Sequence, residues 1–132
     1  MQLYLQDNLL FTDILICYQS IELNISHVLI DTGSASTVLS ADMVETINIF
    51  PEPNDPLHIV RGVGGSEVVF EKHLDYLQIG SQRIKQFAVE IGAMDYGFAI
   101  HGILGMDFLL QAGAVLDLNA MQIEFKIKTS IN

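Results

Sequence analysis

An aspartate directly follows an apolar run in the segment Val28-Leu29-Ile30-Asp31-Thr32-Gly33-Ser34-Ala35. A carboxylate at the end of a strand is held by a rigid element and still reaches the loop side, where chemistry usually takes place. Two carboxylates placed a few ångströms apart cannot both ionise, so they share one proton. One of them can then activate water while the other protonates a leaving nitrogen. Asp31 is therefore a candidate for amide hydrolysis, provided that a second carboxylate is supplied.

Other chemistries find little support in the sequence. The histidines lie far apart without a paired spacing, so no metal site is predicted: they are His27, His58, His73 and His101. The single cysteine, Cys17, sits inside a strand-like run and is interpreted as a small buried hydrophobe. The glycine-rich stretch 62–65 is followed by no lysine and no helical pattern, which argues against a phosphate-binding loop. No cofactor is expected.

Composition limits the partners. Six Lys and Arg against sixteen Asp and Glu give a formal charge of −10, which would repel a nucleic-acid backbone. No apolar run reaches the roughly 18 residues that span a bilayer, and no signal peptide is recognisable, so no membrane partner and a cytoplasmic location are expected. Half of the residues are apolar, which suggests apolar surface left over for a protein partner.

The chain reads as mostly β, with one or two short helices. In the first half, strands are predicted over 9–18, 21–25 and 27–30. Ser40 could cap a short helix over 41–47, and 50–56, which holds all three prolines, is a loop.

The second half is predicted to begin with a hairpin. Two strands within 58–79 flank a glycine-dense tip over 61–66, and the apolar phase slips between Tyr76 and Leu77, which indicates a bulge or a bend. The remaining expectations are strands over 84–91 and 103–105, a helix over 106–111 that ends near Gly113, and a closing strand over 121–128. There is no linker or repeat, so residues 1–132 are expected to form one domain.

Three of these segments together resemble the retropepsin-like aspartic peptidases, in the cellular and bacterial single-domain branch. Asp31-Thr32-Gly33 matches the catalytic motif, Ile103-Leu104-Gly105 the later apolar strand beside it, and the 60–68 hairpin the flap. Leu104-Gly105-Met106-Asp107-Phe108-Leu109 is similar to the Leu-Gly-x-Asp-x-Leu segment of that branch. The resemblance covers about residues 12–127 and rests on the order and spacing of the motifs.

This resemblance implies an all-β, closed, barrel-like acid-peptidase lobe acting as a homodimer. The chain has a single Asp-Thr-Gly, so a symmetry mate would supply the second carboxylate and Asp31 of each subunit would be catalytic. The substrate would be a peptide or protein, cleaved as by an endopeptidase. The positions implied for substrate binding are Thr32, Gly33, Ser34, Ala35, Gly62, Val63, Gly64, Gly65 and Ile103.

Several roles follow for individual residues. By resemblance, Thr32 would hydrogen-bond across the dimer axis, whereas Asp107 would be structural. A Ser34 hydroxyl that donates to Asp31 would favour the ionised form. Together with the self-repulsion of two acidic subunits, it leads to the expectation of an acidic pH optimum. Arg61 could contact substrate or be a solvated edge charge, and His101 could touch substrate without a catalytic role.

Interpretations without catalytic activity also remain open. Asp-Thr-Gly by itself is a common turn. The chain could also be a catalytically silent dimer of the same fold that binds peptides or scaffolds an assembly. A third alternative is a monomeric β-barrel that binds a small molecule. The sequence indicates neither the natural substrate, the cleavage specificity nor a physiological trigger.

Overall fold

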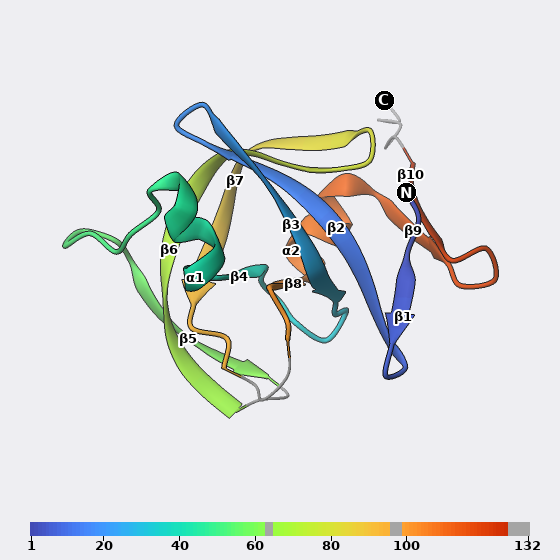
Figure 1. The fold of residues 1–132 in the computed structure, drawn as a ribbon, viewed down its shortest axis with the longest axis horizontal. Coiled ribbons are helices and arrows are strands. Elements are labelled where there is room, and N and C mark those ends of the chain that lie inside the picture. Colours follow the sequence, from blue (N-terminus) through green and yellow to red (C-terminus); the bar gives the residue numbers. More distant parts are fainter. Residues whose placement is uncertain (63–64, 96–98, 127–132) are drawn as a thin grey trace, which may run out of the picture.

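The computed structural model describes residues 1–62, 65–95 and 99–126 (Figure 1). The strands are β1 Tyr4–Gln6, β2 Leu9–Tyr18, β3 Ile21–Ile30, β4 Val38–Ser40, β5 Leu57–Gly62, β6 Gly65–Ile79, β7 Gln82–Gly92, β8 Gly102–Leu104, β9 Ala114–Asp117 and β10 Gln122–Phe125. The helices are α1 Ala41–Val44, a 3₁₀ turn over Glu45–Ile47, and α2 Met106–Ala112. The prediction of a mostly β chain with short helices is confirmed.

The main sheet closes on itself. Its strands follow the order β1-β2-β3-β8-β4-β7-β6-β5, and β2 also pairs with β6. That additional pairing joins Leu15, Ile16 and Cys17 to Gln78, Leu77 and Tyr76. The ring of strands is therefore continuous from β2 through β8 and β7 back to β2, which is the expected barrel-like lobe, and β5 is left as an outer strand (Figure 1).

The barrel interior is filled by apolar side chains. Leu74, Leu77 and Ile91 from the long strands are fully buried, and so is Phe108 from α2. Phe108 packs edge-to-face between Phe87 and Phe125, with ring centroids 5.6 and 6.5 Å away. The burial of large aromatic and aliphatic groups at one centre is what holds so small a barrel together.

The two helices begin and end close to their predicted positions. Ser40 precedes α1, but its side chain makes no capping hydrogen bond. The turn ends at Asn48, which has a left-handed φ of 66°. Gly113 ends α2 with φ 64°, and its backbone N–H donates to the carbonyls of Leu109 and Leu110. A glycine at this position avoids the strain that a Cβ would bring.

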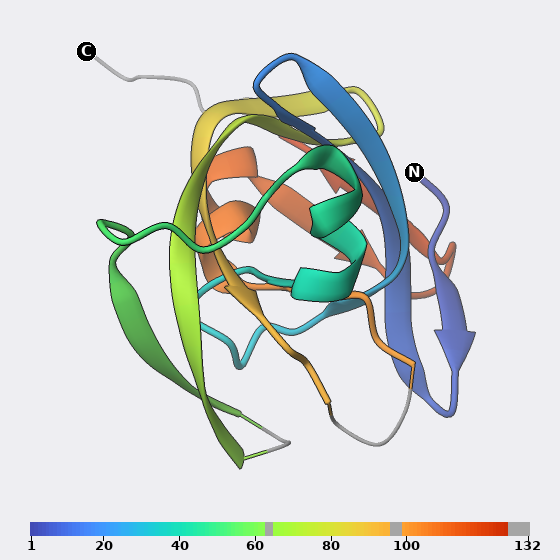
Figure 2. The ribbon, with the colours of Figure 1, turned by 60° about the vertical axis from the view of Figure 1, so that its left-hand side comes forward.

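Two irregularities in the strands have different causes. The segments predicted separately over 21–25 and 27–30 form one strand, β3, in which the pairing with β2 shifts between Thr12 and Ile14 and His27 has φ 55°. That is a β-bulge. By contrast, β6 and β7 keep the same register on both sides of Tyr76, but Asp75 and Gln86 are not paired and Gln86 has φ 54°. The slip in apolar phase therefore coincides with a local break in the ladder of the long, curved strand β6 (Figure 2), without an inserted residue.

The final strand differs from its prediction. β10 does not close the barrel; it pairs with β9 in a separate two-stranded sheet. The N-terminal residues lie along its other side, where the backbone N–H of Leu3 donates to Met121 and that of Ile123 donates to Met1 (2.8 and 3.0 Å). Residues 127 and 128 of the predicted strand lie outside the described residues.

A membrane-spanning helix was not expected from the sequence. Among the residues that the structure describes, no helix is both long and apolar enough to cross a bilayer.

Candidate active site

Asp31 lies just beyond the end of β3, beside β8. The two strands run parallel, with Val28, Leu29 and Ile30 paired to Gly102, Ile103 and Leu104. The pairing continues one step past the strand, because the backbone N–H of Asp31 donates to the carbonyl of Leu104 at 3.0 Å. The carboxylate is therefore anchored to the barrel at its own main chain while its side chain remains partly exposed.

The Asp-Thr-Gly turn is tied to this carboxylate. The backbone N–H of Gly33 donates to Asp31 Oδ1 at 2.9 Å, and that of Ser34 donates to the Asp31 carbonyl at 3.1 Å. Thr32 and Gly33 are both exposed. A Cβ on Gly33 would stand 3.2 Å from Asp31 Oδ1, tighter than an ordinary contact. Glycine thus lets the main chain approach the carboxylate closely.

The predicted contact from Ser34 to Asp31 is not found, and that expectation was wrong. The Ser34 hydroxyl donates instead to the carbonyl of Ser36, at 2.7 Å. This bond closes the turn on itself, because Ser36 lies only two residues further on. The argument for an acidic optimum from Ser34 therefore loses its basis.

A buried threonine, Thr37, anchors the loop that follows Asp31. Thr37 is fully buried, and its hydroxyl donates to Asp107 Oδ1 at 2.7 Å while its backbone N–H donates to Asp107 Oδ2 at 3.1 Å. The same hydroxyl oxygen accepts from the backbone N–H of Gly105 at 3.1 Å. A Cβ at Gly105 would stand 2.4 Å from the Ser36 carbonyl oxygen, so only glycine fits there. Asp107 is structural, as the sequence indicated, whereas the role of Thr37 was not predicted.

The predicted flap is a β-hairpin. β5 and β6 pair without interruption from Leu57 and Phe70 to Gly62 and Gly65. Gly65 has φ 102°, a value that side chains rarely tolerate. Two other predicted site residues, Val63 and Gly64, lie outside the described residues.

A pocket of about 270 Å³ lies between the loop after Asp31 and the flap strand. Its lining residues are Ser34, Ala35, Ser36, His58, Ile59, Val60 and Glu90. Two predicted site residues, Ser34 and Ala35, are thus brought together with β5 of the flap. Val60 and Ile103 pack against one buried apolar cluster, which also includes Leu29 and Val38.

Comparison with known proteins agrees with this geometry. The model of the family described as "gag-polyprotein putative aspartyl protease" matches residues 20–111, more than half of the chain. The chain belongs to this family of retropepsin-like aspartyl proteases. Among solved structures, it is similar to the EIAV protease complexed with the inhibitor HBY-793, with 25% identity and a TM-score of 0.60. That likeness covers 87% of this chain and 98% of the EIAV protease chain. No curated protein sequence matches the chain.

Another predicted contact residue, His101, lies near β8. The backbone N–H of His101 donates to the His27 carbonyl at 2.9 Å, and its ring Nδ1 is 2.9 Å from the carbonyl oxygen of Ser26. These contacts place His101 against the bulge in β3. They give it a structural function in addition to any contact with substrate.

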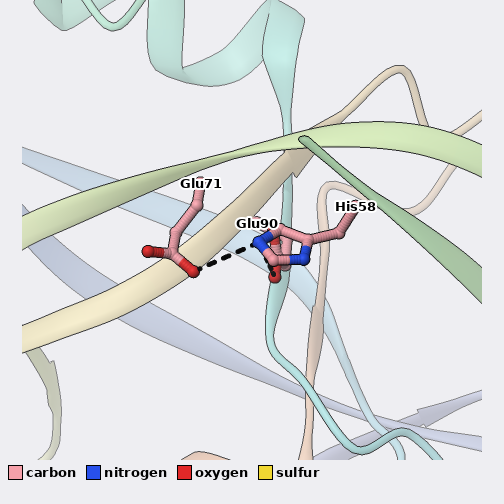
Figure 3. A group of neighbouring side chains, drawn as sticks. All are labelled: His58, Glu71 and Glu90. Atoms are coloured by element: carbon pink, nitrogen blue, oxygen red, sulfur yellow. Dashed lines mark ion pairs between the residues drawn. The ribbon is translucent and has the colours of Figure 1, made fainter. Parts of the chain in front are cut away.

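One group of side chains in the retropepsin-like lobe was missed by the sequence analysis. His58 Nε2 lies 3.4 Å from Glu71 Oε1 and 3.9 Å from Glu90 Oε1 (Figure 3). These donors lie within 4.8 Å of one another, so in type and spacing they could hold a metal ion, although the sequence predicted no metal site. The residues come from β5, β6 and β7, and only the register of three strands brings them together. Their spacing in the sequence carries no signal.

Proposed function

We propose that this protein is an aspartic endopeptidase that acts as a homodimer, with Asp31 of each subunit supplying one carboxylate of the catalytic pair. The observation that carries the proposal is the anchoring of Asp31, whose main chain bonds to Leu104 and whose Oδ1 accepts from Gly33. Family membership supports it. The sequence contains one Asp-Thr-Gly only, so a twofold axis must bring the second carboxylate.

In this mechanism the two carboxylates share one proton because they are too close for both to ionise. The ionised carboxylate takes a proton from water as the water attacks the peptide carbonyl, and the protonated carboxyl donates to the carbonyl oxygen. Proton transfer to the leaving nitrogen then breaks the C–N bond. The pair titrates as a unit, so neither aspartate has a separate role before substrate binds.

The substrate would be an extended peptide lying between the Asp31 loop and the flap. The pocket between Ala35 and Val60 supports this, since it lies where side chains of such a peptide would project. The β5–β6 hairpin supplies backbone groups on the opposite side, and its Gly65 leaves open space where a Cβ would stand. Thr32, exposed at the turn, is suitably placed to bond across a dimer axis.

Neither alternative function gains a specific observation. A silent peptide-binding dimer would need no anchored carboxylate, yet Asp31 is held at two points. A small-molecule-binding barrel would need an interior cavity, whereas the interior here is occupied by buried residues such as Leu77 and Phe108.

The test is a digest of a randomised peptide library by wild type and Asp31→Asn, read by mass spectrometry. Asn is nearly isosteric but cannot share the proton, so turnover should fall by about 10³-fold or more with the fold retained. Asp42→Asn is the matched control, because Asp42 is exposed on helix α1 and is not part of the Asp31 loop. Equal cleavage by Asp31→Asn and wild type would refute the mechanism, and binding without cleavage by wild type would favour the silent dimer.

A further inference from the structure

The pocket beside the Asp31 loop has an acidic end. Its walls are small or apolar at Ala35 and Val60, and its charged lining residue is Glu90 of β7, close to His58 of the flap strand. The Glu90 side chain is only 13% exposed. A carboxylate this far from water needs a partner to remain ionised.

Among the residues that the structure describes, the partner of Glu90 is a distant one, the imidazole of His58. Its Oε2 is buried and accepts no hydrogen bond there. Its Oε1 is 3.9 Å from His58 Nε2, which is beyond hydrogen-bond distance. Burial raises the pKa of Glu90, the nearby carboxylates of Glu71 and Asp107 raise it further, and His58 opposes them.

The strand register places a second negative charge beside Glu90. Glu71 and Glu90 are directly opposite each other on β6 and β7, a pairing that is destabilising for like charges. The His58 imidazole is the group that faces both, and it is 46% exposed (Figure 3). A cation entering the pocket would meet the Glu90 carboxylate, to which Glu71 is paired on the neighbouring strand.

We propose that this pocket is a specificity subsite for an arginine or lysine side chain of the bound peptide, and that Glu90 is the residue that selects it. The inference rests on the proposed function, because the pocket is a subsite only if a peptide lies beside Asp31. The aliphatic stem of the side chain packs against Ala35 and Val60, and its charged end reaches Glu90. Arginine fits best, since its planar fork can donate two parallel hydrogen bonds to the Glu90 carboxylate.

The experiment separates binding from cleavage. Peptides of one sequence carry arginine, lysine, glutamate, citrulline or methionine at one position at a time, and citrulline is a neutral analogue of arginine. Binding to the Asp31→Asn protein is measured by fluorescence anisotropy, and kcat/KM with wild type. A chelator is present throughout, so that no metal ion occupies the carboxylates.

At one position, arginine should be preferred over citrulline by about tenfold or more in both assays, as expected for hydrogen bonds to a charged group. Glu90→Gln should remove the preference, and Glu90→Lys should reverse it toward glutamate. Glu45→Gln, at an exposed site on the 3₁₀ turn, removes the same charge and should leave the preference unchanged.

The outcomes distinguish the two proposals. If peptides are cleaved with no basic preference at any position, the subsite proposal is wrong and the peptidase proposal stands. The same holds if Glu90→Gln leaves the preference intact. A basic preference in binding without cleavage supports the subsite and refutes the peptidase. Peptides that are neither bound nor cleaved overturn both. The wild-type preference is a test in itself, so a Glu90 variant that fails to fold does not remove the test.

Discussion

Thr37 and Asp107 are joined by two hydrogen bonds, from the threonine hydroxyl and from its backbone N–H to the two oxygens of one carboxylate (2.7 and 3.1 Å). The pair connects the loop after Asp31 to the first turn of α2. Because the hydroxyl also accepts from Gly105 N–H, strand β8, helix α2 and the Asp31 loop share one buried junction. The position of the candidate catalytic carboxylate therefore depends on a residue six positions away from it.

Replacing Thr37 tests this junction. Thr37→Val keeps the shape but removes one of the donors to Asp107 Oδ1 and leaves the Gly105 N–H without its acceptor, so the free energy of unfolding should fall by about 1–3 kcal/mol. Turnover measured well below the melting temperature should fall too, since the loop loses its support. Thr46→Val, at an exposed threonine that bonds only to the Met43 carbonyl, is the control. Equal effects of the two changes on stability would contradict the assignment.

A catalytic site shared between two subunits predicts that specific activity depends on protein concentration. Specific activity should fall on dilution below the dimer dissociation constant, because a monomer holds half of the pair. In an exchanged equimolar mixture of wild type and Asp31→Asn, activity per wild-type subunit should be about half that of wild type alone, since mixed dimers are inactive. A monomer in sedimentation that retains full specific activity would exclude the shared site.

Replacing Gly65, at the tip of the predicted flap, should affect activity more than stability. Gly65→Ala forces a side chain into φ 102°, and the strain should distort the hairpin tip. Turnover should fall about tenfold or more, by loss of a positioning element, while the melting temperature changes little. Gly80→Ala is a matched control, because Gly80 also has positive φ (56°) but lies in the β6–β7 turn. It should lower stability and leave turnover unchanged. Similar turnover in both variants would show that the hairpin is not a flap.

The ion pairs of a buried lysine give stability a pH dependence. Lys72, only 5% exposed, lies 2.6 Å from Glu52 and 2.9 Å from Asp55. The hydrogen bond from Lys72 holds the pKa of Asp55 below its ordinary value. A lowered pKa means that the pair stabilises the fold above the unfolded-state value and that this contribution is lost as pH falls through the folded-state value.

The check is thermal unfolding of Lys72→Met at pH 7 and at a pH below 3. The variant should melt several degrees below wild type at pH 7, and the difference should shrink in acid as Asp55 becomes protonated. Lys85→Met, which removes an exposed lysine from β7, should show neither effect. A difference that stays constant between the two pH values would argue that Lys72 acts through packing alone.

Strands with strong β-forming runs were predictable from the sequence. Leu9–Tyr18 was predicted to the residue, because the segment is rich in residues that favour strands. The short strand Val38–Ser40 was missed, because three residues carry too little pattern and only pairing with β7 and β8 keeps them extended. Gly102–Leu104 is equally short and was predicted one residue late, over 103–105.

The candidate site was predictable only where residues are consecutive. Asp31, Thr32 and Gly33 form a local turn, and local turns leave a signature in sequence. Thr37 with Asp107 and His58 with Glu71 and Glu90 meet across distant segments, and no periodicity marks such contacts. The hydroxyl of Ser34 was misassigned for a related reason, since the carbonyl of Ser36 competes for it within the same turn.

The pairing of β2 with β6 has a consequence for how the chain folds. Only three residue pairs close the ring, and they join Leu15–Cys17 to Tyr76–Gln78, some 60 residues further along the chain. Both neighbouring hairpins, β2–β3 and β6–β7, are local, so they can form before the long loop between β2 and β6 is closed at a cost in chain entropy. We expect the β2–β6 pairing to form last, with refolding on the millisecond-to-second scale of non-local β proteins. Amide hydrogens in the β2–β6 pairing should accordingly exchange with a lower free energy of opening than those between β6 and β7.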